Sequence, residues 1–128
     1  MNMIVHYVFS TYKRQFILTD PDAVSDISTW FVEIAKDKGL IIIELAILAD
    51  HVHMLIEQRS QTRPKIAMQF LKGISSRNFF KKYNALPRWQ FKRLWQKSYK
   101  CWIIPTNNLD NIRKYIKGQN VRGIDKRF

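Results

Sequence analysis

The chain lacks the features that mark several large classes of protein. Its 128 residues include one cysteine, Cys101, so an internal disulfide and a cysteine-rich zinc cluster are both excluded. No apolar run reaches the roughly 18–20 residues that a membrane span needs. The first residues carry neither the basic flank nor the cleavage site of a signal peptide. We therefore expect a single domain over residues 1–128 of a cytoplasmic protein with no membrane partner.

Acidic side chains are missing from the middle of the chain. Residues 58–109 contain no Asp or Glu but twelve Lys and Arg, and the whole chain has a formal net charge of +12. Residues 1–57 have the opposite bias, with eight acidic and four basic side chains. Such asymmetry is typical of a protein that binds a polyanion.

Aromatic residues are interleaved with these cations, although some of the rings must belong to the core. Proteins that bind single strands combine cations, which follow the phosphates, with aromatic faces on which bases stack. A membrane surface would attract the same cations, but the aromatic residues favour nucleic acid. The side chains expected to contact it are Arg59, Arg63, Lys72, Arg77, Lys81, Lys82, Arg88, Trp89, Lys92, Arg93 and Lys97.

Hydrophobic periodicity predicts the order β-α-β-β-α-β, followed by one more helix. Strands are expected at residues 4–11, 40–48, 51–57 and 98–104. Helices are expected from Pro21 to Gly39, from residues 62–64 onward, and from residue 109 to about residue 118. Residues 84–93 read as a basic, aromatic loop that touches ligand, and residues 119–128 as a polar, basic tail.

This order is that of the ferredoxin-like sandwich, an α+β fold. A four-stranded antiparallel sheet carries two helices on one face. The other face is then open for a functional site, and the additional C-terminal helix carries Tyr115.

A His-x-His pair follows the most apolar run of the chain. Side chains two apart on a strand share a face, so His51 and His53 should stand together while Val52 and Met54 enter the core. Two neutral imidazoles are half of a divalent-metal site, although such a pair is more often two ordinary histidines. His6 is a competing third ligand if its strand is a neighbour. Asp50 should point away from the histidines if the strand is regular through it.

The last predicted helix offers two further polar groups. Tyr115 and Gln119 are four residues apart and therefore share a stripe of the helix surface. Gly118 lies between them and either weakens the helix by roughly 1 kcal/mol relative to alanine or ends it. Each side chain is unremarkable in isolation.

Taken together, these residues resemble the single-tyrosine transposases of the histidine–hydrophobic–histidine (HUH) nuclease class. These are the enzymes of the smallest insertion-sequence family and their repeat-associated (REP-associated) relatives. The matching segments are His51-Val52-His53 within residues 50–55, Tyr115 within residues 114–119, the aromatic strand at residues 94–99, and residues 8–14. In the last of these, a lysine and a tyrosine stand in swapped order.

The resemblance implies a DNA transposase that cleaves and rejoins single-stranded DNA at insertion-sequence ends. Tyr115 would be the nucleophile and would form a 5′-phosphotyrosine link. His51, His53 and Gln119 would bind Mg²⁺ or Mn²⁺, and no other small-molecule cofactor is implied. The expected partners are DNA hairpins at the element ends and a second copy of the chain, in a homodimer.

Two other functions remain open at this point. One is a non-catalytic module that binds single-stranded RNA or DNA on a ferredoxin-like sheet. The other is a basic structural protein of a ribonucleoprotein particle. Binding that survives both chelation and loss of Tyr115 would distinguish them from the transposase.

Overall fold

The computed structural model of the protein describes residues 1–83 and 93–122. The predicted contacts Arg88, Trp89 and Lys92 lie outside these residues, as does nearly all of the predicted loop. The strands are β1 (Asn2–Ser10), β2 (Ile41–Ile47), β3 (His51–Arg59) and β4 (Lys100–Ile104). The helices are α1 (Pro21–Asp37), α2 (Pro64–Lys82) and α3 (Leu109–Arg122), with short 3-10 turns at Tyr12–Arg14 and Thr106–Asn108.

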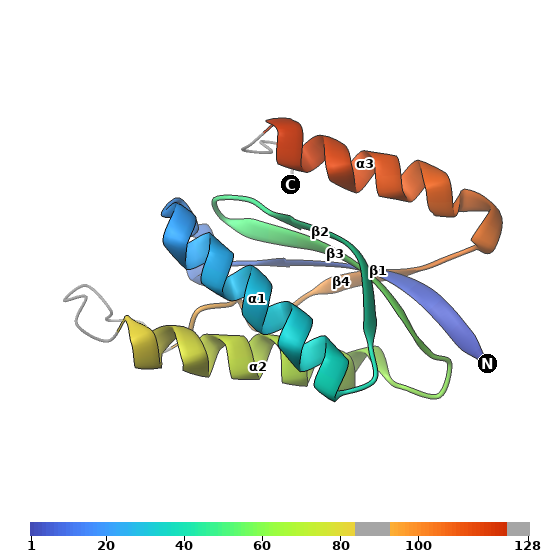
Figure 1. The fold of residues 1–128 in the computed structure, drawn as a ribbon, viewed down its shortest axis with the longest axis horizontal. Helices are drawn as coiled ribbons and strands as arrows, with labels where there is room; N and C mark the ends of the chain where they lie inside the picture. Colours follow the sequence, from blue (N-terminus) through green and yellow to red (C-terminus); the bar gives the residue numbers. More distant parts are fainter. Residues whose placement is uncertain (84–92, 123–128) are drawn as a thin grey trace.

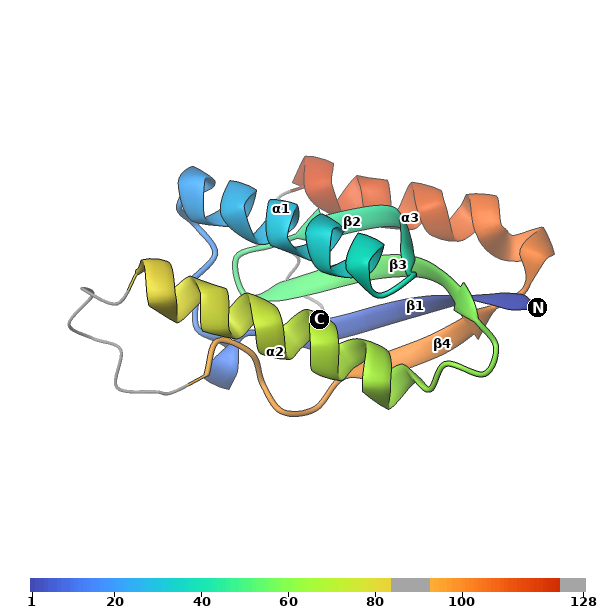
Figure 2. The same ribbon diagram turned by 60° about the horizontal axis from the view of Figure 1, so that its bottom comes forward.

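The four strands form one sheet in the order β2-β3-β1-β4, and every neighbouring pair is antiparallel. Figure 1 shows α1 and α2 on one side of this sheet and α3 on the other. Seen from the side of α1 and α2, these two helices lie next to each other across the strands (Figure 2). The predicted ferredoxin-like α+β sandwich with an additional C-terminal helix is confirmed.

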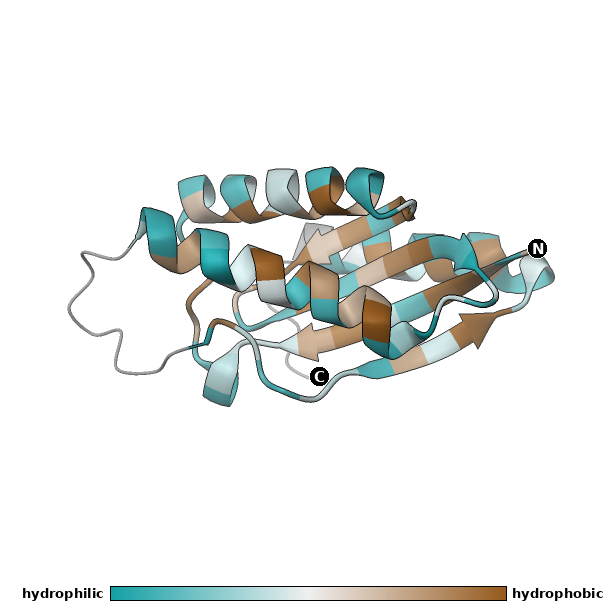
Figure 3. Cartoon of the chain, turned by 90° about the horizontal axis from the view of Figure 1, so that it is seen from below, coloured by the Kyte–Doolittle hydropathy of each residue, from teal (hydrophilic) through white to brown (hydrophobic). Residues whose placement is uncertain are grey.

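Alternation along the strands sorts the side chains onto two faces. Val52, Met54 and Ile56 of β3 are fully buried against the layer formed by α1 and α2, together with Phe31 and Leu71 of those helices. Figure 3 shows apolar residues along the strands beneath the two helices. This face holds most of the buried core. Burying each large aliphatic or aromatic side chain contributes about 1.5–3 kcal/mol.

The opposite face of the sheet has a smaller apolar cluster under α3. Ala46 of β2 and Leu55 of β3 pack against Ile116, which is fully buried, and Ile112 lies at the edge of the cluster. The two isoleucines are one turn apart on α3, so a single stripe of this helix covers part of this face of the sheet. The histidines lie on this same face.

The ends of α1 follow the sequence signals. The side chain of Asp20 accepts a hydrogen bond from the backbone N–H of Asp22, and Pro21 occupies the first turn. Gly39 has a φ of +72°, the left-handed conformation that commonly follows a helix end. The chain then turns directly into β2.

Two boundaries differ from the predictions. The fourth strand begins only at Lys100, because Trp95 instead forms an isolated bridge with Thr11 and buries its ring in the core. Helix α3 continues through Gly118 to Arg122, so the predicted tail was wrong for residues 119–122. Gln119 is buried on this extra turn, which a solvated tail would not explain.

No helix within the described residues is long and apolar enough to span a membrane.

Candidate active site

His51 and His53 lie where β3 runs past α3. Their exposed fractions are 0% and 2%, and their ring centroids are 5.1 Å apart. Val52, between them, points into the core on the other face. The period of two along the strand therefore brings the two imidazoles together.

The neighbouring strand adds a third imidazole. Nε2 of His6 on β1 lies 3.1 Å from Nδ1 of His53, a hydrogen-bond distance, and the two rings stack. Burial lowers the pKa of His6 to about 4, so this ring is neutral at pH 7. The condition set for His6 is thus met, since β1 and β3 are neighbours, and its contact is made to the ring of His53.

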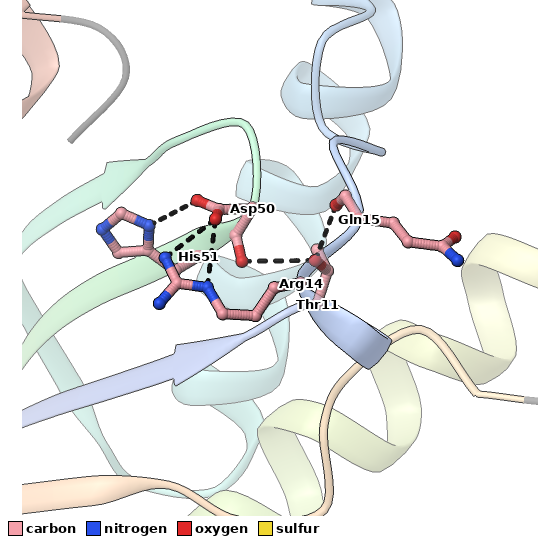
Figure 4. Close-up of polar contacts among 5 residues, drawn as sticks. All are labelled: Thr11, Arg14, Gln15, Asp50 and His51. Carbon is pink, nitrogen blue, oxygen red and sulfur yellow. Dashed lines mark hydrogen bonds and ion pairs between the residues drawn. The ribbon is translucent and has the colours of Figure 1, made fainter. Parts of the chain in front are cut away.

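Asp50 contacts His51 directly, which corrects the expectation that it points away. Oδ1 of Asp50 is 2.7 Å from Nδ1 of His51 (Figure 4). Asp50 precedes β3 in a turn that is closed by a 2.8 Å hydrogen bond from Leu48 N–H to the carbonyl of His51. The alternation of a strand does not apply inside this turn. Because an ionised carboxylate can only accept, Nδ1 of His51 is the donor.

Tyr115 reaches the histidines from α3. Its ring centroid is 5.6 Å from that of His53 and 6.3 Å from that of His6, in edge-to-face arrangements. The side chain remains 43% exposed. A phenol that is in contact with buried imidazoles and also open to solvent can meet a large substrate.

Gln119 lies one turn beyond Tyr115. Helical geometry directs it between Tyr115 and the buried Ile116, and its exposed fraction is 1%. Its Oε1 is buried and accepts no hydrogen bond from the residues that the structure describes. Such an oxygen is costly unless a ligand satisfies it.

The donor set of this cluster can be compared with the needs of a metal ion. Within residues 1–83 and 93–122, no three His, Cys, Asp or Glu side chains are grouped so that they could hold a metal. A metal site on His51 and His53 would then need a ligand of another type, and the buried carboxamide oxygen of Gln119 is chemically suited to that role. In both histidines Nδ1 makes the contact described above, so Nε2 is the atom to consider for a metal.

The predicted nucleic-acid contacts are spread over the surface. A groove of about 530 Å³ lies between α2 and residues 93–99, and Lys72, Arg93 and Lys97 line it. The remaining predicted cations in the described residues, Arg59, Arg63, Arg77, Lys81 and Lys82, do not line this groove. Lys82 instead forms a 2.7 Å ion pair with Asp26.

This groove and the histidines lie on opposite faces of the sheet. Nζ of Lys72 is 5.7 Å from the ring centroid of Phe9, whose side chain belongs to the core under α1 and α2. The same Nζ donates 3.1 Å hydrogen bonds to the carbonyls of Lys97 and Ser98. Lys72 thus holds one wall of the groove in place.

The sequence model of a family described as Transposase IS200 like matches residues 1–119. The chain belongs to the IS200-like transposase family. The ISDra2 transposase TnpA of Deinococcus radiodurans is 31% identical to this transposase in an alignment of 111 positions that covers 85% of this chain and 77% of the relative. Membership of this family places the protein in DNA transposition.

Solved structures share the fold of the transposase. The crystal structure of a candidate transposase from Deinococcus radiodurans R1 has a TM-score of 0.73 and 26% identity, covering 93% of this chain and 92% of that one. A REP-associated tyrosine transposase bound to a REP hairpin has a TM-score of 0.69 at 15% identity, covering 94% and 67%. The second likeness concerns the fold alone.

Three side chains of the transposase take places that the sequence did not assign to them. Lys65 lines the groove beside the predicted cations, as its position on the polar face of α2 could have indicated. Trp95 is 3% exposed and donates from Nε1 to Ser75, so it belongs to the core. Trp102 is 48% exposed, and its ring centroid lies 5.4 Å from that of His6, on the face of the histidines.

Proposed function

We propose that this transposase cleaves and rejoins single-stranded DNA at insertion-sequence ends, with Tyr115 as the nucleophile. The observation that carries the proposal is the contact between the exposed phenol of Tyr115 and the buried pair His51 and His53. A DNA strand can approach this phenol from solvent, while the imidazoles stay within the protein.

The reaction follows from phosphoryl-transfer chemistry. Oη of Tyr115 loses its proton and attacks the phosphorus of the scissile phosphodiester. The bond to the 3′ oxygen breaks, and this oxygen takes up a proton to become the 3′-hydroxyl. The 5′-phosphotyrosine link that results keeps the energy of the phosphodiester. The same hydroxyl, or one from another DNA end, later attacks this link and releases Tyr115, so rejoining needs no ATP.

His51, His53 and Gln119 would hold Mg²⁺ or Mn²⁺ through two imidazole nitrogens and the carboxamide oxygen. When bound, such an ion supplies Lewis-acid polarisation of the phosphate and offsets its negative charge. The buried Oε1 of Gln119 supports this assignment, because the protein keeps a polar atom there that its own described residues do not satisfy.

The proposed substrate is single-stranded DNA with hairpins. The groove lined by Lys72, Arg93 and Lys97, together with the predicted cations elsewhere on the chain, would hold phosphates. The fold neighbour with a bound REP hairpin supports a hairpin as the probe. Phosphate contacts would position the strand, and contacts to bases would select its sequence.

The proposal includes a homodimer. Strand β4 is at the edge of the sheet, and its Trp102 and Ile103 are 48% and 66% exposed. An edge with exposed apolar side chains readily pairs with another chain. Sedimentation equilibrium tests this part separately from the chemistry.

The deciding experiment is a cleavage assay with a labelled library of single-stranded hairpins. Wild type with Mn²⁺ should form a covalent protein–DNA band that disappears with EDTA and in Tyr115→Phe. Tyr83→Phe is the matched control, because this phenol donates to Asp26 in the layer of α1 and α2, and the variant should still form the adduct.

Two results would oppose the proposal. Adduct formation by Tyr115→Phe would assign the nucleophile elsewhere. Tight binding of hairpins without any adduct in the presence of Mn²⁺ would favour the non-catalytic binding module.

A further inference from the structure

The two oxygens of Asp50 have different partners. Oδ1 lies 2.7 Å from Nδ1 of His51, and Oδ2 accepts from Nε and Nη2 of Arg14 at 3.1 and 2.8 Å (Figure 4). The side chain of Asp50 is 8% exposed and that of His51 is fully buried. The guanidinium thus balances the charge of a carboxylate that is held out of water.

The backbone at Lys13 and Arg14 has a costly conformation. Lys13 and Arg14 have φ values of +55° and +54°, in the left-handed region that L side chains rarely enter. Strain of this kind persists only where surrounding contacts impose it, and it is concentrated at functional sites. Here it lies in the turn after β1, at the residue whose side chain contacts Asp50.

The main chain of Asp50 is held as firmly as its side chain. Its carbonyl accepts from the N–H of Thr11 at 2.9 Å and from the hydroxyl of Thr11 at 3.2 Å. The same hydroxyl is 2.7 Å from the carbonyl of Gln15 (Figure 4). The segment that follows β1 is therefore bonded to the turn before β3 twice, through Thr11 to the carbonyl of Asp50 and through Arg14 to its carboxylate.

We propose that Asp50, held in place by Arg14, is the residue that positions His51 for metal binding. By accepting from Nδ1, the carboxylate fixes the imidazole in the tautomer whose Nε2 carries no proton and can bind a cation. It also fixes the rotation of the ring. The inference rests on the proposed function and extends it to two residues outside the proposed ligand set.

The carboxylate cannot be replaced by its amide without a conflict. In Asp50→Asn, an amide that keeps its oxygen toward His51 presents its NH₂ group to the guanidinium of Arg14, donor against donor. An amide turned the other way presents NH₂ to Nδ1 and shifts the ring proton to Nε2. Either arrangement removes a contact on which the position of His51 depends.

The first test measures the ring proton without any metal. Long-range ¹H–¹⁵N spectra of the metal-free protein report the tautomer of each histidine, with His51→Gln used to assign the signal. We expect His51 in the Nδ1–H form in wild type, and mixed with or shifted to the Nε2–H form in Asp50→Asn. A wild-type His51 protonated at Nε2 would overturn the inference.

The second test is Mn²⁺ affinity, measured by calorimetry and by the electron paramagnetic resonance signal of unbound Mn²⁺. Loss of such an outer partner typically weakens binding 10- to 100-fold, and we expect that range for Asp50→Asn. Arg14→Gln should weaken it less and keep the fold, because its side chain is 40% exposed. In the Asp50→Asn background, Arg14→Gln should weaken Mn²⁺ binding no further, since Arg14 acts through the carboxylate.

Asp26→Asn is the matched control, because Asp26 is also an ion-paired carboxylate but lies on α1 against Lys82. It should bind Mn²⁺ as wild type does. Equal affinity in Asp50→Asn and wild type would overturn the positioning role and leave the proposed metal site intact. If His51→Ala binds Mn²⁺ as wild type does, the proposed metal site itself fails and the positioning role fails with it.

Discussion

Glu44 on β2 accepts a 3.1 Å hydrogen bond from Nε of Arg113 on α3, and Nη2 of the same arginine is also 3.1 Å from its Oε1. Lys117, one turn further along α3, places Nζ 3.5 Å from this oxygen. The carboxylate is 13% exposed. It therefore ties the helix that carries Tyr115 to the sheet that carries the histidines.

Removing the charge of Glu44 should weaken the attachment of α3 to the sheet without unfolding the protein. We expect Glu44→Gln to lower the free energy of unfolding by less than about 1 kcal/mol, since the side chains of the two cations are 41% and 62% exposed. Amide hydrogen exchange in α3 should become faster, and the covalent adduct should form several-fold more slowly. Glu33→Gln, a neutralised carboxylate on the exposed face of α1, is the control. Unchanged exchange in α3 would show that its apolar stripe alone holds the helix.

Gln119 should show opposite effects on stability and metal binding. Its buried Oε1 has no hydrogen bond from the described residues, so Gln119→Met should raise the free energy of unfolding of the metal-free protein by about 1 kcal/mol. The same change should weaken Mn²⁺ binding at least tenfold, because a ligand is lost. Chemical denaturation and calorimetry measure the two effects, with Gln61→Met at an exposed turn as control. A variant with lower stability and unchanged affinity would remove Gln119 from the site.

The groove on the helix side should determine how salt affects DNA binding. We expect Lys97→Ala to weaken hairpin binding and to reduce the slope of log K against log salt by about 1, the change for one lost phosphate contact. Arg93→Ala should act similarly. Lys36→Ala, on the exposed face of α1, should leave the slope unchanged. Fluorescence anisotropy between low and moderate salt measures the slopes. Equal slopes in all variants would show that the DNA does not contact this groove.

Lys72 should make stability depend on pH. Burial, and to a smaller degree the nearby Arg93, lowers its pKa from 10.5 to about 8. Between these two values the unfolded chain binds a proton that the folded chain has lost, so the free energy of unfolding should rise with pH across that window. Below about pH 8 both states are protonated and this dependence ends.

Lys72→Met removes the titrating group and keeps an unbranched apolar stem. Urea unfolding of both proteins from pH 7 to 10.5 gives the difference in stability, which cancels the titration of other groups such as tyrosines. The free energy of unfolding of wild type should rise relative to that of the variant as the pH increases. Parallel curves would mean that the folded pKa of Lys72 is close to its ordinary value.

Two glycines should respond to alanine with opposite signs. A Cβ at Gly39 or at Gly118 would meet nothing within 4 Å, so sterics do not decide either case. Gly39→Ala forces a side chain to a φ of +72° and should cost about 1–2 kcal/mol. Gly118→Ala lies inside α3 and should add about 0.5–1 kcal/mol. Thermal unfolding measures both, and a loss in Gly118→Ala would show that α3 needs a flexible point there.

Much of the fold could be predicted because it follows from local pattern. The period of two places Val52 and Met54 in the core and His51 beside His53. Asp20 and Pro21 mark the start of α1 because they meet the needs of unpaired backbone N–H groups at a helix end. The density of Lys and Arg in residues 58–109 indicates a polyanion before any fold is known.

The errors occurred where a tertiary contact outweighs the local signal. Asp50 contacts His51 because it lies in a turn, where no strand alternation holds. Trp95 fills the core under α2 instead of extending β4, since its indole finds a hydrogen-bond partner in Ser75. Helix α3 passes Gly118 because the stripe of Ile112 and Ile116 rests on the sheet, and Gln119 follows on its buried side.

The order of elements, the two faces of each strand and the uneven charge are therefore properties of the sequence, because each depends on residues close together in the chain. Strand pairing and helix docking decide the rest. Pairing of β1 with β3 brings His6 to His53, and docking of α3 brings Tyr115 to within 5.6 Å of the same ring. Burial of apolar surface between distant segments sets both arrangements, and no local pattern records which segments will meet.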